Sequence, residues 1–85
     1  MTAEERIKAI HALLSDHISP TFLEIEDNSD EHAGHKSAGG AGHYTVHIAS
    51  PLFAGKNMLQ QHRLVYSAVE PLMDSEIHAL SIKIK

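Results

Sequence analysis

Apolar residues recur along this chain with two periods, and the first period is that of a helix. Thr2 and Glu5 have the spacing of a capping box, in which each residue satisfies an orphan amide at a helix start. We therefore expect a helix that begins at about Ala3 and ends before Ser19-Pro20. The apolar positions that follow the cap return every three or four residues: Ile7, Ile10, Leu13 and Leu14.

From Thr21 onward the period changes to two, which is typical of strands with one buried face. Three segments alternate in this way. Their apolar positions are Leu23 and Ile25, then Tyr44, Val46 and Ile48, then Leu80, Ile82 and Ile84. The intervening positions predict a water-facing sheet surface that carries Glu24, Glu26, His43, Thr45, His47, Lys83 and Lys85.

A second helix is predicted between the second and third strands. Asn57 and Gln60 resemble another polar cap, and Pro71 should kink or tighten the last turn because it removes one amide. A helix that joins two strands favours parallel pairing between them. The predicted buried stripe of this helix comprises Met58, His62, Val65, Val69 and Leu72, with Tyr66 beside it.

The order of elements is therefore helix, strand, strand, helix, strand. It predicts an α+β fold of αββαβ type, with a three-stranded mixed sheet and both helices packed on one face. Because the chain has 85 residues, we expect residues 1–85 to form a single domain.

Composition excludes some classes of chemistry. The chain has no cysteine, so it cannot provide a disulfide, a thiolate nucleophile or a cysteine metal site. Its formal charge of −4 argues against a main role in binding the phosphate backbone, although eight histidines could reverse the sign at acid pH. Apolar runs fall far short of the ~20 residues that cross a bilayer, and the N-terminus has no apolar secretory stretch. We expect a cytoplasmic protein that does not enter membranes.

One connection is longer than a hairpin needs. The segment SDEHAGHKSAGGAG, from Ser29 to Gly42, exceeds the ~12 residues above which a loop without secondary structure is usually functional or disordered. It contains four glycines and two histidines, His32 and His35. These histidines are candidate metal ligands on a mobile loop, or simply solvated side chains.

Two motifs resemble the BolA family. The segment FAGKNMLQQHRLVY, from Phe53 to Tyr66, is similar to the signature of that family, and Ile77-His78-Ala79-Leu80 is similar to the motif that opens its last strand. The resemblance covers nearly the whole chain, including the strand at Phe22–Glu24. It implies a class II KH-like fold of αββαβ order, which agrees with the periodicity.

The resemblance also implies a function. BolA proteins pair with monothiol glutaredoxins in iron–sulfur cluster trafficking or iron sensing. In that complex a 2Fe-2S cluster is shared, with thiolates from glutaredoxin and glutathione. His78 then matches the family's histidine ligand, and His32 matches the histidine-type loop ligand, with His35 as the alternative. The isolated protein is expected to be a monomer without a cluster.

Imidazole ligation explains how a chain without cysteine could enter such chemistry. Histidines in place of thiolates on one iron raise the reduction potential and make ligation sensitive to protons. By strand parity His78 should share the inward direction of Leu80, and it lies at the first residues of its strand. Without the resemblance, a half-buried histidine bonded to backbone would be the simpler interpretation.

A second function stays open because some bacterial members of the family regulate transcription, stress response and cell morphology. The residues expected to contact either the partner or DNA are Phe53, Gly55, Lys56, His62 and Arg63. Gln61 stands where the family usually has arginine, which removes one positive charge and weakens the case for DNA. His62 on the apolar stripe is more simply a structural contact.

A third alternative is a histidine-only zinc or copper site in a small hydrolase, which would require metal retained by the isolated protein. The residues 39–42 lack the lysine and following helix of a phosphate loop, and Ser37 near His35 does not make a catalytic triad by proximity in sequence. We therefore expect a binding protein rather than an enzyme.

Overall fold

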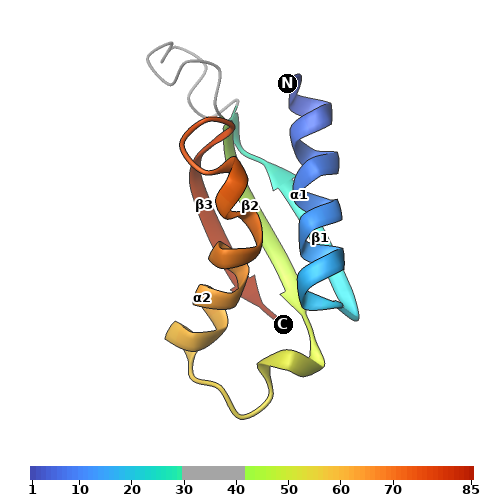
Figure 1. Ribbon diagram of the computed structural model, residues 1–85, viewed down its shortest axis with the longest axis vertical. Coiled ribbons are helices and arrows are strands. Elements are labelled where there is room, and N and C mark those ends of the chain that lie inside the picture. Colours follow the sequence, from blue (N-terminus) through green and yellow to red (C-terminus); the bar gives the residue numbers. More distant parts are fainter. Residues whose placement is uncertain (30–41) are drawn as a thin grey trace.

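The computed structural model describes residues 1–29 and 42–85. The elements, in chain order, are helix α1 (Ala3–Ile18), strands β1 (Phe22–Asp27) and β2 (Gly42–Ala49), helix α2 (Met58–Val69) and strand β3 (Ile77–Ile84). Short 3₁₀ helices, η3 (Pro51–Phe53) and η4 (Glu70–Leu72), lie on either side of α2. Figure 1 shows the predicted order of two helices and three strands.

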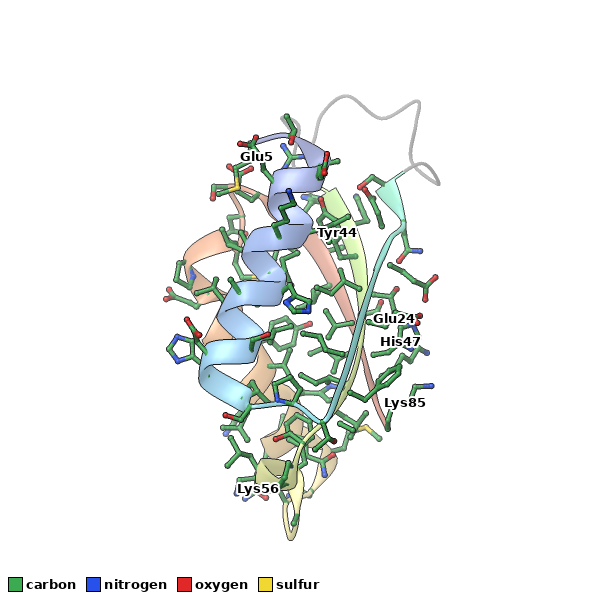
Figure 2. All side chains as sticks on the ribbon, turned by 90° about the vertical axis from the view of Figure 1, so that its right-hand side faces the viewer. Glu5, Glu24, Tyr44, His47, Lys56 and Lys85 are labelled. Atoms are coloured by element: carbon green, nitrogen blue, oxygen red, sulfur yellow. The ribbon has the colours of Figure 1, made fainter. Side chains whose placement is uncertain are left out.

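The sheet has the order β1-β2-β3, with β1 antiparallel and β3 parallel to the central β2. The predicted mixed sheet and the parallel crossover through α2 are therefore confirmed. Ile25, Val46 and Ile82 are in register across the three strands and face the same side. In Figure 2 both helices cover that side, while Glu24 and His47 lie on the other, open side.

The core is apolar among the described residues, with no buried charged side chain. It joins the inner face of the sheet to one stripe of each helix, which hides the periodic positions from water. The buried residues are Ile10, Leu14, Ile18, Tyr44, Val46, Ile48, Phe53, Val65, Ala68, Val69, Leu72 and Ile77.

Both helices start at the caps that the sequence predicts. The Thr2 hydroxyl accepts from the Glu5 amide at 3.1 Å while the Glu5 carboxylate accepts from the Thr2 amide at 2.7 Å. Asn57 and Gln60 form the same reciprocal pair at the start of α2. The last turn before Met73 tightens into η4, which contains Pro71, as expected for a residue without an amide hydrogen.

Two residues predicted for the core lie at the surface instead. Met58 is 70% exposed and Tyr66 is 40% exposed. The buried face of α2 is set by Val65, Ala68 and Val69, and Figure 1 shows the start of the helix toward the lower end of the molecule. The first turn therefore extends beyond the layer that would cover it. Tyr66 lies beside that face, and its hydroxyl donates to the Leu80 carbonyl oxygen at 3.0 Å.

Among the described residues, no helix has both the length and the apolar character needed to cross a bilayer.

Candidate functional site

The candidate site begins at an irregularity in the pairing of β2 with β3. Gly42 pairs with Ile77, but the next residue of β2, His43, pairs with Ala79. His78 is therefore an extra residue in β3, and the strand forms a β-bulge at this point.

The bulge decides where His78 points. Ile77 is fully buried, whereas His78 and Ala79 are both exposed, and the alternation resumes at Leu80. The expectation that His78 shares the inward direction of Leu80 is therefore wrong. The extra residue breaks the period of two and turns the imidazole to the open side of the sheet.

The same bulge brings a second imidazole to His78. The ring centroids of His43 and His78 lie 5.1 Å apart, with their planes tilted by 55°. The His43 residue is partly exposed on the open face. Simple alternation places His43 on the water-facing side and His78 on the inner side of the sheet, so the sequence pattern did not bring the two rings together.

Backbone hydrogen bonds fix this end of the sheet. The His43 amide donates to the Ser29 hydroxyl at 3.1 Å, and the Asn28 amide donates to the His43 carbonyl oxygen at 2.7 Å. On the side of β3, the Gly42 amide donates to the Glu76 carbonyl oxygen at 3.0 Å. The main chain on both sides of the histidine pair is thus held by hydrogen bonds.

Behind the pair, Tyr44 fills the space that Gly42 leaves. A Cβ atom on Gly42 would lie 2.5 Å from the Tyr44 hydroxyl oxygen, which is closer than atoms can pack. Tyr44 is 2% exposed, and its hydroxyl has no hydrogen-bond partner among the described residues. Burial raises the pKa of this hydroxyl, with the nearby Arg6 acting in the opposite direction.

The predicted loop ligands His32 and His35 lie outside the described residues. The prediction that one of them is the second ligand therefore stays a prediction. Ser29 and Gly42, which flank that segment, both lie beside the histidine pair through the hydrogen bonds and pairing given above.

The other predicted contact residues lie around the turn that precedes α2. Gly55 has a φ of 75°, a left-handed conformation that favours glycine. The Gln61 amide nitrogen donates to the carbonyl oxygens of Phe53 at 3.1 Å and Lys56 at 3.0 Å, which closes the turn. Gln61 thus has a structural role in this turn.

Exposure divides these contact residues into two kinds. Lys56 and Arg63 are exposed and Gly55 is open to solvent, whereas His62 is partly buried. Phe53 is only 5% exposed and belongs to the core, so its side chain anchors the turn and presents little surface to a partner.

The predicted residues that lie in the described part of the chain do not form one continuous site. Figure 2 shows Lys56 at one end of the molecule and Tyr44, the neighbour of His43, toward the other. The histidine pair and the turn around Gly55 therefore lie at different ends of the fold. A single small ligand cannot contact both.

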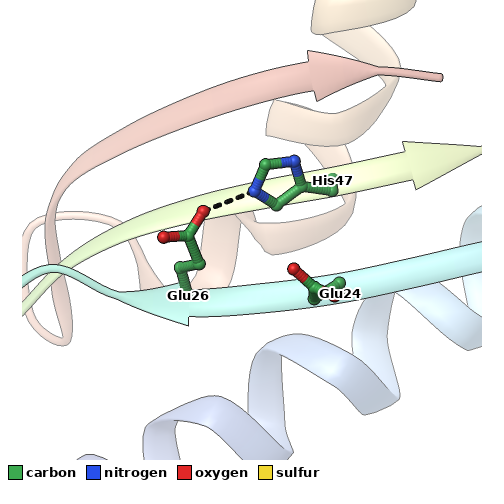
Figure 3. Close-up of side chains that lie close together, drawn as sticks. All are labelled: Glu24, Glu26 and His47. Carbon is green, nitrogen blue, oxygen red and sulfur yellow. Dashed lines mark hydrogen bonds and ion pairs between the residues drawn. The ribbon is translucent and has the colours of Figure 1, made fainter.

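A further polar cluster lies on the open face of the sheet. His47 Nε2 lies 2.5 Å from Glu26 Oε1, and Glu24 is the cross-strand neighbour of His47 (Figure 3). One ligand atom from each of the three residues lies within 4.8 Å of the others. The hydrogen bond from His47 lowers the pKa of the Glu26 carboxyl. Lys83 on β3 is the cross-strand neighbour of His47 on the side opposite to Glu24.

This αββαβ fold, with an exposed histidine at the start of its last strand, defines a class of small α+β domains, and comparison with known proteins identifies the class. Residues 14–85 match the family described as BolA-like protein. The chain belongs to the BolA-like family.

Curated relatives agree with this assignment. SufE-like protein 1, chloroplastic/mitochondrial, of Arabidopsis thaliana is 40% identical over 82 residues, a match that covers 89% of this chain and 22% of that protein. Protein BOLA1, chloroplastic, of the same plant is 39% identical and the match covers 93% of this chain and 52% of that protein. The chain thus spans about a fifth to about half of the length of these relatives. The DNA-binding transcriptional regulator BolA of Escherichia coli is 32% identical, with 93% and 67% covered.

Solved structures show the same fold. The BolA domain of SufE1 from Arabidopsis thaliana superposes with a TM-score of 0.81 at 34% identity, covering 100% of this chain and 94% of that one. BolA1 from the same plant gives a TM-score of 0.78 at 36% identity, covering 94% and 89%.

Proposed function

We propose that this protein is an adaptor that binds a monothiol glutaredoxin and shares with it a 2Fe-2S cluster supported by glutathione. Its role would lie in iron–sulfur cluster trafficking or in iron- and stress-dependent regulation, without enzymatic activity of its own. The observation that carries the proposal is the exposed imidazole of His78, which the β-bulge turns out of the core at the end of the sheet.

The donor set of the chain is compatible with such a cluster. Iron–sulfur clusters are held by thiolates, but two histidines can replace two cysteines on one iron, as in Rieske centres. The chain has no cysteine, so in this proposal it contributes imidazole, and the thiolates come from the partner and glutathione. When bound, the cluster would supply one-electron redox chemistry and a transferable iron–sulfur unit.

Each candidate ligand of the chain has a defined part in this proposal. His78 would present a nitrogen to the partner's side of the cluster, and its place next to paired strands limits the entropy lost on binding. His32, or His35 as the alternative, would be the loop ligand. A cytoplasmic location remains a prediction, and the two plant relatives are named as chloroplastic or mitochondrial proteins.

The proposal is tested by reconstitution. The protein is mixed with a monothiol glutaredoxin, glutathione, ferrous iron and sulfide under anaerobic conditions. We expect a heterodimer with visible absorption and circular dichroism that differ from those of the glutaredoxin homodimer. His78→Ala should abolish or change that spectrum, whereas His47→Ala, on the same open face, should leave it unchanged.

Two results would contradict parts of this proposal. If the wild-type protein forms no cluster-containing complex, the adaptor function fails. If His78→Ala retains the full cluster with the same spectrum, the ligand assignment fails while the partnership stands.

A second candidate function is DNA binding, and one observation favours it. The turn at Gly55 and Lys56 is exposed at the start of α2, with Arg63 exposed on the same helix, and the Escherichia coli relative is named a DNA-binding transcriptional regulator. Because only two fixed cations lie in this region, we expect weak binding. A gel-shift titration at physiological salt that gives no better than the nonspecific range of about 10⁻⁴ to 10⁻⁶ M would exclude it as the main role.

A further inference from the structure

We propose that Glu24, Glu26 and His47, on the open face of the sheet, bind one divalent transition-metal ion such as Zn²⁺. The site combines two carboxylates from β1 with one imidazole from β2, and Figure 3 shows the three side chains close together on these neighbouring strands. It shares no residue with the proposed cluster ligands, His78 and the loop histidines. The site therefore goes beyond the proposed function and needs neither glutaredoxin nor a cluster.

Strand register brings the three donors together. Glu24 and Glu26 are two positions apart on β1, so their side chains point to the same face of the sheet. His47 on β2 pairs directly with Glu24 and lies diagonally to Glu26, a spacing that long side chains bridge. The backbone spacing of the three ligands is thus fixed by paired strands before any ion binds, which favours affinity.

The donor atoms lie close to the separations that one ion requires. Zinc is bound at about 2.0–2.2 Å by imidazole nitrogen and carboxylate oxygen, so two ligand atoms on a tetrahedral ion are about 3.3–3.5 Å apart. His47 Nε2 and Glu26 Oε1 are 2.5 Å apart, and one ligand atom from each of the three residues lies within 4.8 Å of the others. Rotation of the exposed Glu24 side chain and a small opening of the His47–Glu26 contact would place all three atoms around a single ion.

The contact between His47 and Glu26 distinguishes this site from an ordinary group of solvated carboxylates. An imidazole nitrogen from one strand is aimed at a carboxylate oxygen from the next, and the two atoms share one proton. A metal ion takes the place of that proton when both atoms ligate it. The His47 side chain is only 18% exposed, against 50% for Glu26, so its ring has little rotamer freedom left to lose on binding.

The mixed donor set selects the class of ion. Imidazole nitrogen suits Zn²⁺, Fe²⁺ and Ni²⁺, whereas Mg²⁺ and Ca²⁺ prefer sites made of oxygen alone. Three protein ligands leave one tetrahedral position for water or for a donor from another molecule, which is the arrangement of an open site rather than a structural one. Both helices lie on the other side of the sheet, so neither of them covers that position (Figure 2).

One positive charge beside the site opposes the binding of a cation. Lys83 on β3 is the cross-strand neighbour of His47, on the side opposite to Glu24. Lys83 is exposed, and its long side chain can extend into water, so it lowers the affinity without blocking the site. Removal of this charge should therefore tighten binding, an effect that general destabilisation of the fold would not produce.

The experiment titrates the full chain, freed of metal and without glutaredoxin, with ZnCl₂ at low ionic strength. NMR follows the ring nitrogen resonances of the histidines, and the Kd of this site is read from the shift of the His47 ring itself. Zinc bound by histidines elsewhere in the chain therefore does not enter the measurement. We expect the His47 shift to saturate, and MgCl₂ in large excess should not reverse it.

Four variants test the ligands and the charge. Glu24→Gln and Glu26→Gln should each raise the Kd at least tenfold, because each removes one carboxylate ligand. Glu4→Gln is the matched control: it removes the same charge from an 80% exposed position on α1 and should keep the wild-type Kd within twofold. Lys83→Ala should lower the Kd severalfold, because it removes the opposing cation.

Three results would overturn the inference. If zinc shifts other rings of the wild-type protein but not that of His47, there is no site on this face, and this result needs no variant to fold. A Kd for Glu24→Gln equal to that of Glu4→Gln would show that the carboxylate acts only through net charge. A Kd that does not fall in Lys83→Ala would place the ion away from this residue. Because glutaredoxin is absent, failure here leaves the cluster proposal standing, and the reverse also holds.

Discussion

Arg6 and Glu76 are separated by 70 positions in the chain, yet the Arg6 Nε donates a hydrogen bond to the Glu76 Oε1 at 2.9 Å. The bond ties the second turn of α1 to the turn that leads into β3. The N-terminal ammonium lies 3.7 Å from the same carboxylate oxygen. Glu76 also accepts the Gly42 amide through its backbone oxygen, so this ion pair supports the end of the sheet that carries the histidine pair.

The first prediction concerns acid stability. The hydrogen bond from Arg6 holds the pKa of the Glu76 carboxyl below its ordinary value of 4.5. A lowered folded-state pKa adds stability that is present above pH 4.5 and is lost as the pH falls through the folded pKa. Glu76→Gln should therefore lower the unfolding free energy near neutral pH and reduce its fall toward acid.

Urea unfolding between about pH 7 and about pH 3 measures both effects. Glu4→Gln is the control, because Glu4 is 80% exposed and its ion pair among the described residues is with Lys8, along the helix. An equal acid dependence in the Glu76→Gln variant and the wild type would show that this pair does not contribute to the pH dependence.

The second prediction concerns the glycine behind the histidine pair. Gly42→Ala should destabilise the fold by about 1–3 kcal/mol, because its Cβ would overlap the Tyr44 ring and force the bulge to shift. The control is Gly55→Ala, which meets no atom within 4 Å and should cost about 1 kcal/mol through its positive φ alone. Chemical denaturation compares the two, and an equal loss of stability in both variants would show that the contact with Tyr44 adds nothing to the cost.

The third prediction concerns Phe53, which the sequence suggested as a surface contact. Phe53→Ala should cost about 3–5 kcal/mol of stability, because a nearly buried ring leaves a cavity. Leu52→Ala is the matched control: the side chain is 45% exposed, and the loss should stay below about 1 kcal/mol. Thermal or urea unfolding measures the difference. If the Phe53 variant were as stable as the Leu52 variant, the Phe53 side chain would not stabilise the core, and its predicted role as a contact residue would stand.

The fourth prediction concerns the open face of the sheet. Because the hydrogen bond from His47 is the main reason that the Glu26 pKa is lowered, His47→Ala should raise that pKa back toward 4.5. An NMR titration of the side-chain carboxyl carbon measures it. Lys83→Ala should have a smaller effect, since Lys83 acts on Glu26 only through its charge. A larger shift in Lys83→Ala than in His47→Ala would reverse this assignment.

Much of the fold could be predicted because its signals are local. The capping pairs Thr2–Glu5 and Asn57–Gln60 mark where the helices begin, and the tightening at Pro71 follows from a missing amide hydrogen. The alternation in β1 and β2 gave the inner and outer faces of the sheet correctly. Met58 and Tyr66 were assigned to the core in error, because periodicity reports the side of a helix and not how far the neighbouring layers reach.

The residues themselves determined that the chain offers histidine and carboxylate but no cysteine to a metal, where the two helices begin, and that the chain resembles the BolA family. Only the tertiary structure decided that His78 faces outward, that His43 lies beside it, and that the turn at Gly55 is far from both. A β-bulge depends on how two strands distant in sequence match in register, and one extra residue reverses the side to which a histidine points. Local sequence patterns carry no information on that match, so the pairing of the two histidines appears only when the sheet is assembled.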